Sequence, residues 1–223
     1  MSQVTCKQSV LCVYKDCDWL SPEYIKHLYH GLKRYLPQDF QLYCLTDDHR
    51  GWIYDVIYLP MYEDWPSRYA KIEMWSPELE KLGDILYIDL SSVIIGSVSP
   101  FIRKDLDAIV SDGFAKGRPT PSQSIIYFKK GWGRTIYEEF KRDPDKYMEI
   151  GNRGKWPNFY DQTMMSVKAP DSFYPKELIK SWKIDCRQES KRIPKDASIV
   201  KFHGSPRPHE VEWAYDLRVV YHQ

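Results

Sequence analysis

A single aspartate stands between two apolar runs near the middle of the chain. Ile85–Ile88 leads directly into Asp89, and the run 93–95 follows after Leu90-Ser91-Ser92. A carboxylate in such surroundings is costly to bury unless a cation or hydrogen bonds accompany it. A divalent ion that bridges a diphosphate is one such partner, because Mg²⁺ and Mn²⁺ prefer oxygen ligands. Capping of a turn or of a neighbouring helix explains Asp89 equally well, and both interpretations stay open.

A second polar group is the loop His203-Gly204-Ser205-Pro206-Arg207, which follows the apolar run 199–202. Its prolines stiffen the loop, and its glycine permits close approach of the backbone to a ligand. An imidazole can ligate a metal, and a guanidinium offers a forked donor to phosphate. A lone histidine is more often structural, but three such groups on one rigid loop favour a binding site.

Two further polar clusters could face a ligand. In Asn158-Phe159-Tyr160-Asp161-Gln162, Asp161 has the position of an N-cap for a helix that starts at Gln162. The same residues could instead offer hydrogen bonds to a sugar. The cluster Pro121-Ser122-Gln123-Ser124 has a similar composition and leads into an apolar run. Each cluster therefore has a structural and a functional interpretation.

Alternating strand and helix patterns must position these groups. Strands are predicted at 9–14, 41–45, 53–59, Ile85–Ile88, 108–110, 125–128 and 199–202, with 93–95 extended, and helices at 22–36, Ser67–Trp75, 134–141 and 162–167. Ser21 is expected to cap the first helix, with Pro22 as its first residue. We predict one α/β domain over residues 1–223, with a Rossmann-like βαβ first half that leads into a mixed central sheet flanked by helices. Ligands of such sheets lie beyond the carboxyl ends of the strands, which selects 14–16, 46–48 and 89–91.

The composition excludes several classes of protein. Lys and Arg number 32 against 31 Asp and Glu, which argues against a nucleic-acid-binding protein. The five cysteines are Cys6, Cys12, Cys17, Cys44 and Cys186, and their spacing does not suit a zinc site. Cys12 and Cys44 lie in apolar runs and are expected to be buried. We find no signal peptide and no apolar run of transmembrane length, so we expect a cytoplasmic protein with reduced thiols.

Taken in order, these groups resemble the GT-A-fold nucleotide-sugar glycosyltransferases, most closely the family-8-like group of bacteria and viruses. The resemblance spans nearly the whole chain. It is carried by Val10-Leu11-Cys12-Val13-Tyr14-Lys15, the helix 24–36, Tyr43-Cys44-Leu45-Thr46-Asp47, Lys71-Ile72-Glu73-Met74-Trp75-Ser76-Pro77, Leu86-Tyr87-Ile88-Asp89-Leu90, Ile179-Lys180-Ser181-Trp182-Lys183 and the segment 200–208. The resemblance implies a GT-A-type domain that transfers a sugar from a nucleoside-diphosphate donor, such as a UDP-sugar, to a carbohydrate or other hydroxyl acceptor. It also implies Mn²⁺ or Mg²⁺ as the cofactor.

The resemblance implies a role for each matching residue. Val13, Tyr14 and Lys15 would line the pocket of the base, and Lys71 would approach the ribose or phosphates. Asp89 would ligate the metal or contact the ribose, with Ser91 and His203 as further metal ligands. Ser122, Ser124, Asp161 and Gln162 would face the donor sugar and acceptor, and Gly204 and Arg207 would lie near the diphosphate. Asp161 and Gln162 are the candidates for the reacting face of the sugar.

The chain departs from the family at the Asp-x-Asp motif, which reads Asp89-Leu90-Ser91 here. In addition, Ser122 stands where the family often has Asn. A serine hydroxyl is a neutral and weaker ligand than a carboxylate. An alternative is therefore a catalytically impaired domain that binds a sugar nucleotide or a glycan. A nucleotidyltransferase is disfavoured because the chain has no Gly-rich phosphate loop near its N-terminus.

Overall fold

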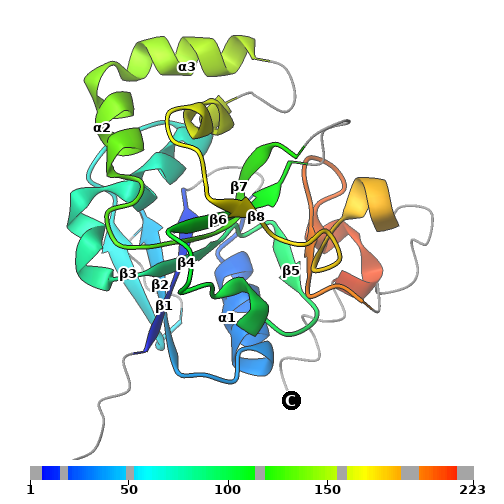
Figure 1. Ribbon diagram of the computed structural model, residues 1–223. Helices are drawn as coiled ribbons and strands as arrows, with labels where there is room; N and C mark the ends of the chain where they lie inside the picture. Colours follow the sequence, from blue (N-terminus) through cyan, green and yellow to red (C-terminus); the bar gives the residue numbers. More distant parts are fainter. Residues whose placement is uncertain are drawn as a thin grey trace, which may run out of the picture.

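A seven-stranded sheet runs through the centre of the protein, in the strand order β3-β2-β1-β4-β7-β6-β8 (Figure 1). The structure, a computed structural model, describes residues 7–15, 20–48, 53–113, 119–154, 160–186 and 196–214. The strands are β1 (Gln8–Tyr14), β2 (Phe40–Thr46), β3 (Val56–Pro60), β4 (Ile85–Ile88), β6 (Ala108–Asp112), β7 (Pro121–Phe128) and β8 (Ser172–Phe173).

The first half of the sheet is parallel and has its switch point next to β1. Strand β1 pairs in parallel with β2 on one side and with β4 on the other, so that Cys12 lies opposite Cys44 and Leu11 opposite Tyr87. Strand β7 then pairs antiparallel with β4 and with β6, which makes the sheet mixed. A ligand is expected beyond the carboxyl ends of β1 and β4, where the direction of the strand order reverses.

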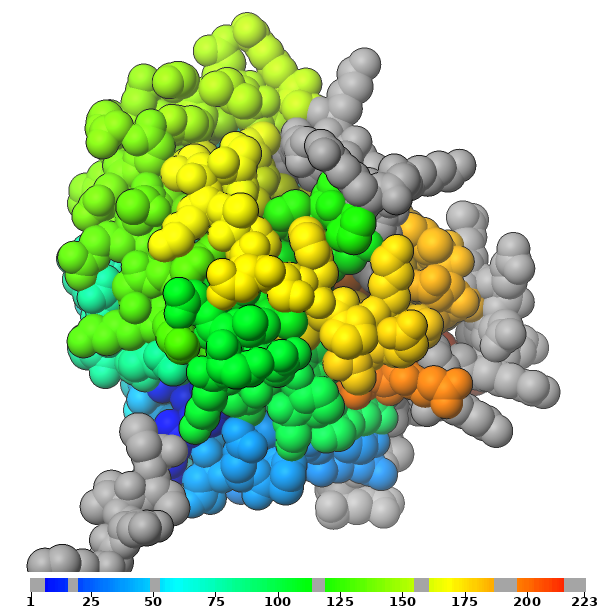
Figure 2. Space-filling view, in the orientation of Figure 1, coloured from blue at the N-terminus to red at the C-terminus, as the bar shows by residue number. Residues whose placement is uncertain are grey.

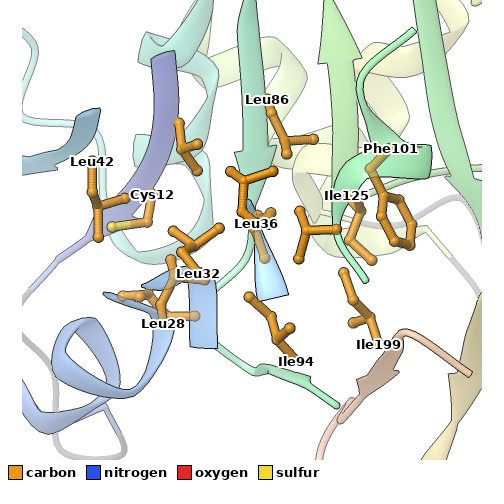
Figure 3. Packing of buried hydrophobic residues seen from close by; sticks show 14 of the residues in the cluster. Cys12, Leu28, Leu32, Leu36, Leu42, Leu86, Ile94, Phe101, Ile125 and Ile199 are labelled. Atoms are coloured by element: carbon orange, nitrogen blue, oxygen red, sulfur yellow. The ribbon is translucent and has the colours of Figure 1, made fainter. Parts of the chain in front are cut away.

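Helices cover both faces of the sheet because the buried strands are apolar on both sides. Helix α1 (Glu23–Tyr35) covers one face, where Leu28 and Leu32 lie near Cys12 and Leu86 (Figure 3). The opposite face is covered by α2 (Arg134–Arg142) and by the 3₁₀ helices η1 (Ser67–Trp75) and η2 (Pro77–Leu82). Residues alternate between the two clusters along β1, as the period of a strand requires.

A three-stranded sheet lies beside the first, in the order β5-β10-β9, and consists of β5 (Ser92–Ile94), β9 (Ile179–Ser181) and β10 (Ile199–Lys201). It packs on α1 through a close approach: a Cβ on Gly31 would lie 3.0 Å from Cβ of Ile94. Trp182 and Phe202 stack on the far side of this sheet, with Trp213 against both rings. The sheet thereby places residues from the end of the chain next to β4.

The remaining helical segments are short or peripheral. They are α3 (Pro144–Arg153), the 3₁₀ helices η3 (Ser99–Phe101), η4 (Tyr160–Ser166) and η7 (Pro208–Glu210), and the π-helical turn η5 (Trp182–Cys186). Figure 2 shows residues that follow α3 in the chain (yellow) on the surface between α2 and α3 (lime green) and α1 (blue). None of the helices in the described ranges is long and apolar enough to cross a membrane.

The fold agrees with the predicted α/β class, including the parallel first half and the mixed second half. Some details differ. The helix predicted at 22–36 spans Glu23–Tyr35, so Pro22 occupies the N-cap position that was predicted for Ser21; Ser21 Oγ still accepts a hydrogen bond from the backbone N of Glu23 at 3.2 Å. The strand predicted at 53–59 is Val56–Pro60. The predicted helices at 67–75 and 162–167 are 3₁₀ helices. Asp161 lies inside η4 rather than before it, so it is not the N-cap.

The cysteines that the structure describes are free and buried, namely Cys12, Cys44 and Cys186. Burial of Cys12 and Cys44 agrees with the prediction from their apolar runs. Cys6 and Cys17 lie outside the described residues, as do Asn158 and Phe159 of the cluster before η4.

Candidate active site

A cavity of about 420 Å³ opens beyond the carboxyl ends of β1 and β4. Val13 from β1 and Asp89, which directly follows β4, form part of its wall. Segments distant in the sequence complete it, namely η1, η4, η5 and the loop after β10. The lining includes four cationic side chains, Arg68, Lys71, Lys183 and Arg207, and two carboxylates, Asp89 and Asp161. These side chains give the described wall an excess of two positive charges.

Asp89 is held by a dense set of donors. Lys71 Nζ donates to its Oδ2, while the backbone N and Oγ of Ser91 donate to its Oδ1 at 2.9 and 2.5 Å. Burial opposes ionisation of Asp89, but Lys71 and Ser91 outweigh it and lower the pKa of this carboxyl to about 2. The pKa of Lys71 rises, because Asp89 and Asp161 outweigh the cost of burying the ammonium. Asp89 and Lys71 therefore form an ionised pair at neutral pH.

The 3₁₀ geometry of η1 explains why a second cation accompanies Lys71. With three residues per turn, side chains three positions apart lie on the same face of such a helix. Arg68 and Lys71 have this spacing and both line the cavity. Residues three positions apart share a face of an α-helix as well, so the helix predicted over 67–75 already contained the signal that Arg68 lies beside Lys71.

Asp161 and Gln162 enter the cavity from η4. Gln123 Nε2 in β7 donates to the backbone O of Asp161 at 2.9 Å, which ties η4 to the sheet. Burial and the negative charge of Asp89 raise the pKa of the Asp161 carboxyl, whereas the ammonium of Lys71 lowers it. The result is a pKa of about 6. Asp161 is thus mainly ionised at pH 7, and its pKa is close enough to neutral for it to accept a proton.

The loop after β10 brings His203, Gly204 and Arg207 to the cavity. Gly204 has φ +78°, in the left-handed region that favours glycine, and the Ser205–Pro206 peptide bond is cis. His203 Nε2 and Ser181 Oγ are 2.7 Å apart and share a hydrogen bond. Burial, with the neighbouring ammonium groups of Lys201 and Lys183, lowers the pKa of His203 to about 4. His203 is therefore neutral at pH 7.

A buried lysine supports the floor of the site. Lys201 is 3% exposed, and its Nζ donates to Ser122 Oγ at 2.9 Å and to the carbonyl of Asp112 at 3.2 Å. Ser122 Oγ lies 3.0 Å from Ser124 Oγ, and Ser124 lines the cavity. Burial lowers the pKa of Lys201 to about 7. Of the two serines singled out from the sequence, Ser124 thus faces the cavity and Ser122 lies behind it.

Two residues expected at the base pocket lie elsewhere. Tyr14 points into the α1 side of the core, where its hydroxyl donates to the carbonyl of Leu20 at 3.4 Å. Lys15 pairs with Asp47 at 3.2 Å and with Asp64 at 2.8 Å. Among the three neighbours, only Val13 lines the cavity. The two-residue period of β1 turns Tyr14 to the face opposite Val13. Lys15 follows the end of β1 and is instead held by the two carboxylates.

Six lining residues were not among the expected site residues: Leu20, Arg68, Leu90, Gln123, Lys183 and Phe202. Gln123 and Phe202 adjoin motifs that the sequence singled out. Lys183 ends the segment Ile179-Lys180-Ser181-Trp182-Lys183 that carries the resemblance, but no role was expected for it, because its place in the wall depends on η5 packing beside the loop after β10. A Cβ on Gly204 would lie 2.8 Å from Lys183 Nζ, so a glycine at 204 was the available signal that another group comes close.

The side chains at Asp89 do not fit the divalent ion that the family resemblance implies. Asp89, Ser91 and His203 all line the cavity, but Asp89 is paired with Lys71 and Ser91, and His203 with Ser181. Divalent ions of this kind usually take carboxylates as ligands, and only one carboxylate is available in this set. In the part of the chain that the structure describes, no group of three or more His, Cys, Asp or Glu side chains could hold a metal ion.

A larger hollow, of about 580 Å³, lies at the opposite end of the strands. Its wall includes Tyr29, Lys33, Asp55 and the beginning of β2 at Phe40. It lies at the amino ends of β1 and β2, away from the switch point, and the buried Asp89–Lys71 pair is not part of it. The smaller cavity is therefore the better candidate for chemistry.

No protein-family profile and no curated protein sequence matches the chain. Solved structures do match. The glycosyltransferase GlyE of Streptococcus pneumoniae TIGR4 superposes with a TM-score of 0.70 at 15% identity, over 96% of this chain and 61% of GlyE. The galactosyltransferase LgtC, in complex with donor and acceptor sugar analogues, gives 0.64 at 11% identity, over 96% of this chain and 95% of LgtC. The bifunctional glycosyltransferase WbbM gives 0.61 at 13% identity, over 97% of this chain and 50% of WbbM.

The chain thus spans less than two thirds of GlyE and nearly all of LgtC. At these identities the comparison concerns the fold. The mixed α/β architecture of this protein is the GT-A-like fold of these glycosyltransferase structures.

Proposed function

We propose that this protein is a glycosyltransferase that moves a sugar from a nucleoside-diphosphate donor to a hydroxyl of an acceptor. The observation that carries the proposal is the cavity at the switch point, whose wall contains four cationic side chains and two buried carboxylates. Its volume of about 420 Å³ suits a small-molecule ligand. An excess of positive charge in a partly enclosed site favours an anion such as a diphosphate.

The fold likeness supports the same reaction class. LgtC is a galactosyltransferase whose structure holds donor and acceptor sugar analogues, and a further LgtC structure is an active-site variant with glutamine changed to glutamate. Gln162 lines the cavity here and is our candidate for a glutamine that contacts the sugar. Because the likeness is structural, the sugar, the base and the acceptor are left open.

In the proposed reaction, the bond between the anomeric carbon and the diphosphate oxygen breaks, and the electron pair stays on the diphosphate. The acceptor oxygen bonds to the anomeric carbon and loses its proton. Preorganised cations lower the barrier of such a step by stabilising the charge that develops on the leaving group. Lys71, Lys183 and Arg207 line the cavity and are our candidates for this task.

Asp161 is our candidate for the acceptor of the proton. It is 3% exposed and lines the cavity, and its raised pKa of about 6 leaves it ionised yet basic enough near neutral pH. Gln162 would hydrogen-bond the sugar from the same helix. No step is assigned to a metal ion, because the side chains around Asp89 do not fit one.

A second candidate is a domain that binds a sugar nucleotide or a glycan without turnover. Ser91 favours it, since its hydroxyl donates to Asp89 in place of offering a second carboxylate. In that case the cavity would still bind nucleoside diphosphates, but Asp161 would have no reaction to assist.

Incubation with a panel of nucleotide sugars, with and without candidate acceptors, distinguishes the two. We expect consumption of one donor, and Asp161→Asn should slow it about 100-fold or more, as for loss of a general base. Asp145→Asn, at an exposed position of α3, is the matched control. Binding of a nucleotide sugar with no turnover, in Mn²⁺, Mg²⁺ or chelator, would favour the second candidate.

A further inference from the structure

Lys183 presents an ammonium group to the cavity that no described residue pairs with. Among the described residues, no hydrogen bond or ion pair involves its Nζ, although it lines the cavity wall. The neighbouring cation Lys71, in contrast, is paired with Asp89. A half-buried ammonium that has lost part of its water is stabilised by an anionic ligand.

The backbone at Gly204 is shaped so that this ammonium comes close. Lys183 Nζ would lie 2.8 Å from a Cβ on Gly204, so a side chain at position 204 would displace the flexible end of Lys183 from its present place. The φ of +78° at Gly204 also disfavours any other residue. Two features of one loop thus leave room for the same cation, beside Arg207 on the cavity wall.

Asp89 cannot supply a comparable place for a divalent ion without losing its present partners. Its Oδ2 is occupied by the ammonium of Lys71 and its Oδ1 by two donors of Ser91. The positive charge nearest to this carboxylate is therefore a side chain of the protein itself. The four cations of the wall exceed its two carboxylates by two charges, close to the charge of a bound diphosphate.

We infer that side-chain cations, with Lys183 as the principal contact, neutralise the donor's diphosphate in place of a divalent metal ion. The protein then binds nucleoside diphosphates in the absence of divalent metal. This inference rests on the proposed function, whose donor it describes more closely. Lys183 acts as a binding residue for the diphosphate, and Gly204 keeps the space for its ammonium.

Calorimetric titration tests the inference on the intact chain. UDP, GDP, CDP, ADP and inorganic pyrophosphate would each be titrated in EDTA and again in Mn²⁺. We expect at least one nucleoside diphosphate to bind in EDTA with the same affinity as in Mn²⁺. Lys183→Ala should weaken this binding about 10- to 100-fold, as for loss of a hydrogen bond to a charged group.

Lys180→Ala is the matched control, because Lys180 lies three residues earlier on β9 and does not line the cavity. It removes the same charge and should leave the affinity unchanged. Lys183→Arg, which keeps the charge, should retain most of the binding. The wild-type titration in EDTA needs no variant, so a folding defect in Lys183→Ala does not remove the test.

The outcomes separate the inference from the proposed function. Binding that requires Mn²⁺ would overturn the inference and leave a nucleotide-sugar transferase standing. An unchanged affinity in Lys183→Ala would overturn the role of Lys183. No binding of any nucleoside diphosphate in either condition would contradict both. If pyrophosphate binds as tightly as the nucleoside diphosphates, the binding of the diphosphate by side-chain cations is supported. A pocket for the base is then contradicted.

Discussion

Asp89 shows how much a residue's role depends on its neighbours. Its position after a buried strand predicts a carboxylate at the edge of the sheet, and the structure places it in the cavity wall. Its partner could not be identified from spacing alone, because Lys71 lies 18 positions earlier and reaches Asp89 only through the packing of η1 on the sheet. The position of the carboxylate is thus predictable from the sequence, whereas its ion-pair partner depends on the fold.

The Asp89–Lys71 pair should make stability depend on pH. The pKa of Asp89 in the folded protein, about 2, is below its ordinary value of 3.8, so its stabilising effect is present above about pH 4 and is lost as the pH falls towards 2. Asp89→Asn should therefore lower the free energy of unfolding by about 1.5–3 kcal/mol at pH 7 and by less at pH 3. Urea unfolding at both pH values measures this.

The exposed Asp39 provides a control for that experiment. Asp39→Asn should change stability little at either pH, since isolated surface charges contribute little. An equal loss of stability for Asp89→Asn at pH 3 and pH 7 would show that the negative charge of Asp89 does not contribute to the stability of the folded protein.

At the scale of elements, the long apolar runs were the most predictable and the short segments the least. Strands β1, β2 and β4 follow from hydrophobic patterning because they are buried on both faces. The second sheet was not predicted as a separate unit. Its strands have three residues each, too few for a periodic signal, and long-range pairing of β5 with β10 holds it together.

The attachment of η4 to β7 should matter for transfer more than for binding. Gln123 Nε2 donates to the carbonyl of Asp161 across these two elements. Gln123→Met should leave that carbonyl unpaired, reduce stability by about 1–3 kcal/mol and lower the transfer rate, because Asp161 and Gln162 lose their anchor. Affinity for the nucleoside diphosphate should persist, since Lys183 and Arg207 lie on other elements.

Steady-state kinetics and diphosphate titration on the same preparation check this separation. Gln41→Met serves as the control, because Gln41 Nε2 bonds to the carbonyl of Asp55 at 3.0 Å, beside the hollow at the amino ends of the strands. An unchanged transfer rate in Gln123→Met would show that η4 does not need this bond.

At the scale of the whole molecule, two sheets meet at one cavity. The central sheet supplies the edge with Val13, Asp89 and Ser124, and the segments next to the small sheet supply Lys183 and His203. We propose on this basis that residues 1–223 work as a single glycosyltransferase domain. The arrangement also explains why a site at the carboxyl ends of the strands was predictable, whereas its full lining was not. Part of the wall, from Lys183 to Arg207, comes from segments far along the chain that only the fold brings to β4.

A crystal structure with a nucleoside diphosphate, grown in EDTA, tests the central claim most directly. The diphosphate is expected beside Lys183, Gly204 and Arg207, with the base towards Val13. Diphosphate density in the hollow lined by Tyr29, Lys33 and Asp55, or density that appears only when Mn²⁺ bridges it to Asp89, would contradict the account.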